Sequence, residues 1–119
     1  MPSQFSQDDD IANAGVIVHV WAVSIAPDDC TAAAQRLSTL MQDTVSGFPG
    51  FLKGEVLEAD DQQSVLALSH WRSRHIWAQA QWNEEVGKTI AALFQAGTKM
   101  VDTMYYVRSV TRNTADPRP

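Results

Sequence analysis

The chain has 119 residues, 45% of them hydrophobic and 19% charged, which is the composition of one soluble globular domain. A net charge of −5, with nine Lys and Arg residues and no basic run, argues against partners such as nucleic acid or an anionic membrane. The longest apolar stretch, 16–25, is far shorter than the roughly 20 residues that a membrane helix needs, and the first residues do not resemble a signal peptide, so we expect a cytoplasmic protein.

The two ends of the chain differ in composition from the rest. Residues 1–14 are polar and include three consecutive aspartates, which is typical of a flexible arm, and residues 111–119 read as a frayed tail. We therefore place the ordered domain at 15–110. The single cysteine, Cys30, excludes an internal disulfide and is expected to be a small packing residue.

Residues 15–25 predict a strand that is apolar on both faces, so both faces should be covered. A helix layer can cover one face, and a second copy of the chain can cover the other. Apolar residues at helical spacing predict a helix that starts after Pro27, capped by Asp28 or Asp29, and ends near a left-handed Gly47.

Two strands, about 51–59 and 64–71, should form a hairpin around the polar loop between them. Ser73 and Asn83 are candidate helix caps, which predicts one kinked helix or two short helices ending at Gly97. A last strand should span about 99–110. The order βαββαβ predicts an α+β, ferredoxin-like domain: a four-stranded antiparallel sheet with helices on one face. The other face is too apolar for water, which predicts a homodimer.

Trp71 is the strongest candidate for a binding residue, because it shares a strand face with the small residues Ala67 and Ser69. Its indole can stack on a planar ligand and donate one hydrogen bond; the alternative is a core tryptophan. His19 shares a strand face with Trp21 and is a candidate for proton transfer, although a hydrogen-bonded core or interface histidine is the competing interpretation.

Three further groups complete the list of candidates. Trp77 should lie near Trp71, Ser69 is a minor hydrogen-bond donor, and Tyr106 belongs to a polar stripe on the last strand, together with Asp102, Met104 and Arg108. The three histidines, His19, His70 and His75, lack metal-ligand spacing, so we expect no metal site. No phosphate loop or nucleophile motif occurs either.

Two segments carry a resemblance to a known family. Residues 45–51 read V-S-G-F-P-G-F, and residues 69–77 read S-H-W-R-S-R-H-I-W. The turn at 49–51, the tryptophan that ends the strand and the aromatic residue at the next helix start resemble the antibiotic-biosynthesis monooxygenase domains over about 15–110. That resemblance implies a dimeric α+β barrel.

The family includes enzymes that oxidise aromatic rings with molecular oxygen and no cofactor, as well as haem-degrading proteins. Members that oxidise polyketides often carry an asparagine where this chain has Ala67, and some carry an arginine near the position of Ile90 or Ala91. Haem-degrading members use a histidine near the position of Thr89 or Ile90. This chain lacks all three residues.

The resemblance implies a cofactor-independent monooxygenase that oxidises an aromatic polyketide-like or quinol substrate with O₂. Trp71 and His19 would supply stacking and proton transfer, with Trp77, Ser69, Trp21 and Tyr106 contacting the substrate. Two alternatives stay open. One is a non-catalytic dimer of the same fold that binds a small ligand or a partner, and the other is a haem-binding or haem-degrading protein.

Overall fold

The computed structural model describes residues 16–115, so the predicted arm at 1–14 and the end of the predicted tail lie outside the described residues. The elements are β1 (Ile17–Ser24), α2 (Pro27–Asp43), η2 (Val45–Gly47), β2 (Phe51–Glu58), β3 (Ser64–Trp71), α3 (Arg74–Ala80), α4 (Glu84–Gln95) and β4 (Lys99–Tyr106). None of the helices in 16–115 is long and apolar enough to cross a membrane.

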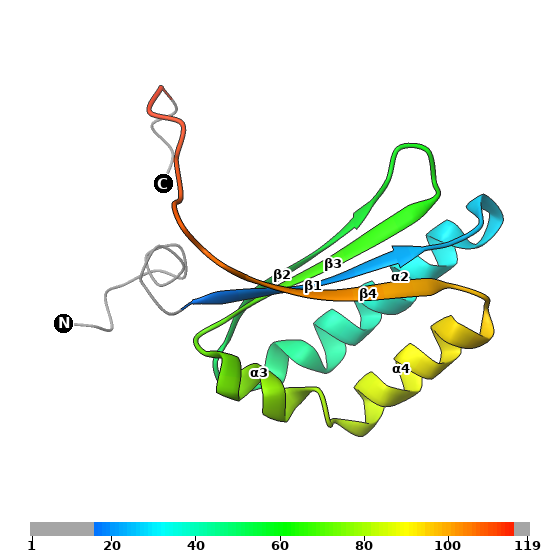
Figure 1. Cartoon of the computed structure of the whole chain (residues 1–119), viewed down its shortest axis with the longest axis horizontal. Coiled ribbons are helices and arrows are strands. Elements are labelled where there is room, and N and C mark those ends of the chain that lie inside the picture. Colours follow the sequence, from blue (N-terminus) through cyan, green and yellow to red (C-terminus); the bar gives the residue numbers. More distant parts are fainter. Residues whose placement is uncertain (1–15, 116–119) are drawn as a thin grey trace.

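The four strands form one antiparallel sheet in the order β2-β3-β1-β4. Helices α2, α3 and α4 all lie on the same side of this sheet (Figure 1). The order and the layering confirm the predicted ferredoxin-like fold. Because β1 is a central strand between β3 and β4, its residues are positioned by both neighbours: His19 pairs with Ser69 on β3 and with Met104 on β4.

The core lies between the sheet and the helices. The alternation of β1 places Ile17, His19, Trp21 and Val23 on the helix side, where Ile17, His19 and Val23 are buried. α2 contributes one apolar stripe to the same core, made of Cys30, Ala33, Ala34, Leu37, Leu40 and Met41. Each large aliphatic side chain buried here contributes about 1.5–3 kcal/mol of hydrophobic stabilisation. Cys30 is fully buried, so it packs as expected.

The opposite face of the sheet carries many apolar side chains. Leu57 and Leu66 face each other across β2 and β3, and Val101 continues the row on β4. All three are exposed, as is Tyr105 further along β4. We call Leu57, Leu66, Val101 and Tyr105, with the half-buried Val20, Ala22 and Leu68 between them, the open sheet face. Its composition fits the predicted pairing of two copies, which stays a prediction.

Two predicted ends of α2 were wrong. Neither Asp28 nor Asp29 caps the helix; both lie in its first turn, after Ala26 and Pro27. Proline suits a first helical position because its missing N–H would have had no partner there. At the other end α2 stops at Asp43 and a 3-10 turn follows, so Gly47 is not a left-handed cap.

The glycine that needs positive φ lies three residues later, at Gly50, where φ is +83°. A Cβ atom added at Gly50 would lie 2.7 Å from Cδ1 and 2.8 Å from Cγ2 of Ile76. Glycine is therefore needed in the P-G-F turn for two reasons. Its positive φ lets the backbone turn into β2, and its lack of a side chain lets α3 pack directly on the turn. This contact sets the position of α3 over the sheet.

The predicted caps of the last two helices were correct. The Ser73 hydroxyl accepts a hydrogen bond from the Ile76 amide, and the Asn83 side chain accepts from the amides of Glu85 and Val86. The region therefore forms two helices rather than one kinked helix. Gly97 adopts φ +85° after α4, and β4 ends at Tyr106 instead of near residue 110.

Candidate functional site

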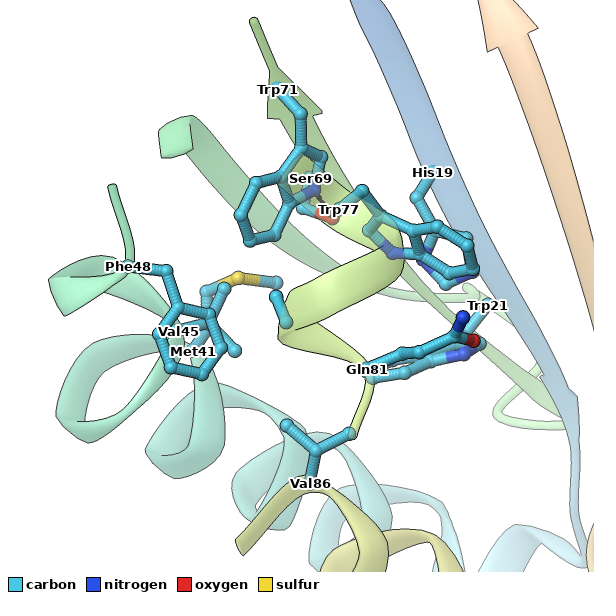
Figure 2. Close-up of a pocket in the computed structure, with 11 residues that line it drawn as sticks. His19, Trp21, Met41, Val45, Phe48, Ser69, Trp71, Trp77, Gln81 and Val86 are labelled. Atoms are coloured by element: carbon cyan, nitrogen blue, oxygen red, sulfur yellow. Dashed lines mark hydrogen bonds between the residues drawn. The ribbon is translucent and has the colours of Figure 1, made fainter. Parts of the chain in front are cut away.

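A pocket lies between the helix side of the sheet and the three helices (Figure 2). Its lining comes from β1 and β3, from α2 with η2 and the segment after it, and from α3 and α4. We call it the inner pocket, and it is lined by His19, Trp21, Met41, Val45, Phe48, Ser69, Trp71, Trp77, Ala80, Gln81 and Val86. These side chains leave about 20 Å³ of free interior, which is room for about one water molecule.

His19 is the ionisable group of this pocket. Its side chain is 2% exposed, and its Nε2 lies 3.0 Å from Oδ1 of Asp102. Burial lowers the pKa of His19 below its ordinary value, and the Asp102 carboxylate opposes this shift through its charge and its hydrogen bond. Burial is the larger effect, so His19 is neutral at pH 7 and can accept a proton.

Two indoles pack against the His19 ring. Trp77 on α3 lies over it, with ring centroids 4.5 Å apart and planes 32° apart, and Trp21 contacts it edge-on at 5.0 Å. Aromatic contacts of this kind contribute about 0.5–1.5 kcal/mol each beyond the area they bury. Because β1 pairing, the Asp102 bond and two indoles all constrain the imidazole, its orientation is fixed before any ligand binds.

Trp71 contributes its ring to the pocket but not its N–H group. The indole Nε1–H donates a 2.8 Å hydrogen bond to the Ser69 hydroxyl, and the ring is packed by Phe48 and Phe51. At 2% exposure Trp71 is both a core residue and a pocket wall. Ser69 is occupied as an acceptor, and its own hydroxyl proton has no acceptor among the hydrogen bonds of residues 16–115.

A second, larger hollow adjoins the inner pocket between α4 and β4. We call it the outer cleft; its free interior is about 430 Å³, and it is lined by Trp21, Trp77, Gln81, Val86, Gly87, Ile90, Ala91, Phe94, Met100 and Asp102. The first four of these residues also line the inner pocket. Shared side chains therefore separate the two hollows. The His19–Asp102 hydrogen bond connects them, because His19 lines the inner pocket and Asp102 lines the outer cleft.

Five of the six predicted site residues come together in the inner pocket: Trp71, His19, Trp77, Ser69 and Trp21. The sixth, Tyr106, lies near the end of β4, is 67% exposed and lines neither hollow. His70 points to the open sheet face, where its Nδ1 is buried without a hydrogen-bond partner among the described residues. His75 is exposed and contacts Gln79. Within 16–115 no three potential metal ligands cluster.

Sequence reasoning missed two polar residues of the site. Asp102 was recognised only as part of a polar stripe on the last strand, and its contact with His19 depends on the register of β4 against β1. Gln81 is the C-cap residue of α3 and lines the inner pocket together with Trp21 (Figure 2). The polar stripe was the available signal for Asp102, because a carboxylate on the helix side of a strand needs a partner.

The fold and the site define a ferredoxin-like domain with an aromatic-lined pocket between sheet and helices. The family model for antibiotic biosynthesis monooxygenases matches residues 16–92. The chain belongs to this family. No curated protein matches it in sequence at a significant level.

Solved structures share the fold at low sequence identity. A Deinococcus radiodurans protein, provisionally assigned as an antibiotic biosynthesis monooxygenase, superposes with a TM-score of 0.71 at 19% identity, covering 82% of this chain and 98% of its own. SnoaB, a cofactor-independent oxygenase from Streptomyces nogalater, gives 0.67 at 16% identity, covering 84% and 100%. A Bacteroides thetaiotaomicron protein of unknown function gives 0.70 at 9% identity, covering 80% and 100%.

Proposed function

We propose that this protein is a cofactor-independent monooxygenase that oxidises an electron-rich hydroxyaromatic compound with O₂. The observation that carries the proposal is the neutral, buried His19, held by Asp102 at the boundary between two aromatic-lined hollows. The family membership and the similarity to a cofactor-independent oxygenase support the same class of reaction.

The chemistry begins with removal of a proton from the substrate. For an anthrone, His19 Nδ1 accepts a ring-activated proton, because Nε2 carries the hydrogen that it donates to Asp102, and the resulting carbanion transfers electrons to O₂. One oxygen atom forms the new carbonyl and the other leaves as water with the two methylene hydrogens, so anthrone plus O₂ gives anthraquinone plus H₂O. Asp102 stabilises the imidazolium that forms, and the indole walls exclude water from the anion.

Each of the other predicted residues has a different part in this proposal. Trp21 and Trp77 present indole surfaces to both hollows, which suits stacking on a planar ring. Trp71 closes the inner wall through its ring, since its N–H is already bonded to Ser69. Tyr106 stays a prediction as a substrate contact.

Oxygen uptake with a panel of anthrones and dihydroxynaphthalenes tests the activity. We expect His19→Gln to lower kcat/KM by at least about a hundredfold, because general base catalysis contributes 10²–10⁴-fold. The matched control is His75→Gln, which removes an exposed histidine of α3 and should change the rate less than twofold. Equal losses in both variants, or full activity of His19→Gln, would refute the assigned role.

A second candidate function has an observation of its own. The inner pocket holds only about 20 Å³, and Ala67 occupies the position where the resemblance expects a polar amide. Both features fit a dimer that binds a small ligand without transforming it. Calorimetric binding of a planar phenol with no oxygen uptake across the panel would favour this candidate over the enzyme.

We infer that two copies pair through the open sheet face. Four exposed apolar residues on one face of a small domain form a patch of the kind that marks an interface. Val101→Glu should then convert a dimer to a monomer in sedimentation velocity. Trp82→Glu is the control, because Trp82 is 83% exposed on the helix side between α3 and α4. A wild-type monomer at high protein concentration would refute the pairing.

A further inference from the structure

The base and the room for a substrate lie in different hollows of the site. His19 lines the inner pocket, whose free interior of about 20 Å³ is far smaller than the pockets that hold small organic molecules. The outer cleft, at about 430 Å³, is large enough for such a molecule, but His19 does not line it. A hydroxyaromatic substrate can therefore reach His19 only if the wall between the two hollows opens.

His19 lies directly behind that wall. The Trp77 indole covers its ring at 4.5 Å between centroids, the Trp21 indole contacts it at 5.0 Å, and its Nε2 bonds Asp102 (Figure 2). All three of these partners line the outer cleft. Displacement of either indole would therefore open the imidazole to the cleft while the sheet stays as it is.

The four side chains that line both hollows differ in how firmly they are held. Trp21 belongs to β1, which pairs with a strand on each side, and Val86 is buried on α4. Trp77 and Gln81 belong to α3 and its C-cap; no residue of α3 is buried, and Gln81 is exposed. Segments with few buried side chains open locally at low free-energy cost. The movable half of the wall is therefore the half that α3 carries.

The closed position of α3 includes two contacts that lifting the helix would break. Ile76 packs on Gly50, so closely that no side chain fits at that glycine, and Trp77 lies over His19. Ile76 lines neither the inner pocket nor the outer cleft. The first contact can therefore be weakened without changing the shape or the chemistry of either hollow.

We propose that α3 is a lid over His19 and that Trp77 is its gate: when α3 lifts, Trp77 and Gln81 leave the wall, and the two hollows join into one cavity that contains both the imidazole and Asp102. This inference rests on the proposed monooxygenase function and adds the conformational step that brings the substrate to its base. Trp77 then exchanges its contact with the imidazole for stacking on the substrate ring.

Carbethoxylation by diethyl pyrocarbonate measures the open lid without turnover, because a buried imidazole reacts only while it is exposed. Trypsin cleavage after lysine and arginine places the three histidines in three different peptides, which mass spectrometry resolves. In the wild type, His19 should react at least tenfold more slowly than the exposed His75. Trp77→Ala should raise the rate of His19 at least tenfold and leave that of His75 within twofold.

A lid also sets the apparent affinity, because a ligand that binds only the open form is weakened in proportion to the fraction of protein that is open. Ile76→Val removes one methyl group from the closed lid, so it should raise the open fraction about fivefold. Calorimetric binding of 2-naphthol without oxygen should then tighten about fivefold, and carbethoxylation of His19 should accelerate by the same factor.

Ile25→Val is the matched control for this variant. It makes the same chemical change at a buried core residue that lines neither hollow, so both the naphthol affinity and the rate of His19 should stay within twofold of the wild type. A variant that merely destabilises the fold has no reason to bind 2-naphthol more tightly. This pair also decides the question if Trp77→Ala fails to fold.

The results that overturn the lid are distinct from those that overturn the enzyme. Wild-type His19 that reacts as fast as His75, a folded Trp77→Ala that leaves His19 as protected as in the wild type, or equal effects of the two isoleucine variants would refute the lid even in an active enzyme. Absence of oxygen uptake with the expected labelling and binding would refute the monooxygenase function and retain the lid.

Discussion

Gly50→Ala should destabilise the fold by about 2–4 kcal/mol. Alanine at φ +83° costs about 1–2 kcal/mol relative to glycine. The new methyl group would also lie 2.7 Å and 2.8 Å from two different branches of Ile76, and 3.4 Å from its Cβ. Relieving both contacts requires a different Ile76 rotamer or a shift of α3, so overpacking adds about 1–3 kcal/mol. A loss of about 0.4–1 kcal/mol in unfolded-state entropy opposes these costs.

Chemical denaturation, followed by circular dichroism and tryptophan fluorescence at one fixed protein concentration, measures the effect. The fixed concentration matters because a dimer gains stability with concentration. For a domain of about 100 ordered residues, 2–4 kcal/mol corresponds to a fall in Tm of roughly 10–20 °C. Gly47→Ala is the control: no atom lies within 4 Å of the added Cβ and φ is not positive, so the change should stay below about 0.5 kcal/mol.

An Ile76→Ala background separates the two causes. Removing both branches of Ile76 abolishes the clash, so Gly50→Ala should then cost only the backbone term, about 1–2 kcal/mol. Equal costs in both backgrounds would show that α3 does not rest on this turn as described. A cost no larger than that of Gly47→Ala would refute the backbone argument as well.

Three further results are expected. NMR titration of His19 should give a pKa below 6.5, and Asp102→Asn should lower that pKa further, because burial then acts unopposed. The unfolded chain binds a proton on His19 more readily than the folded protein does. The free energy of unfolding should therefore fall as the pH drops from 6.5 to the pKa of His19 in the folded protein. Asn83→Ala should cost about 1 kcal/mol in the same denaturation assay, while Asn83→Asp keeps the cap. Cys30 should react with thiol reagents only at the rate of unfolding, because burial raises its pKa and hides it; fast labelling would contradict this.

Local chemistry made part of the fold predictable. The bounds of β3 follow from strict alternation between a polar loop and a polar turn, and the caps Ser73 and Asn83 follow from short side chains that accept from free amides. The N-terminus of α2 was mispredicted for a local reason as well. The helix could begin either after an aspartate cap at Asp28 or Asp29, or with Pro27 as its first residue after Ala26. The spacing of apolar residues does not distinguish these two starts.

The site was less predictable because its parts lie far apart in the chain. Alternation on each strand correctly grouped His19 with Trp21 and Ser69 with Trp71, and the structure places both pairs on the helix side. Asp102 is 83 residues from His19, and it reaches Nε2 as a diagonal neighbour on β4. A slip of one residue in that register would turn Asp102 to the open sheet face, and no sequence feature measures the register.

With alanine at position 67, the polar chemistry of the proposed reaction falls to another residue of the site. Ala67 is buried between Trp21 on β1 and Val56 on β2, and its own side chain lines neither hollow. The polar group of the site lies one strand away, at His19. An amide donates or accepts hydrogen bonds without taking up a proton near neutral pH, whereas a neutral imidazole held by a carboxylate accepts a proton. The proposed reaction therefore needs a substrate with an acidic proton, which the hydroxyaromatic compounds proposed above carry.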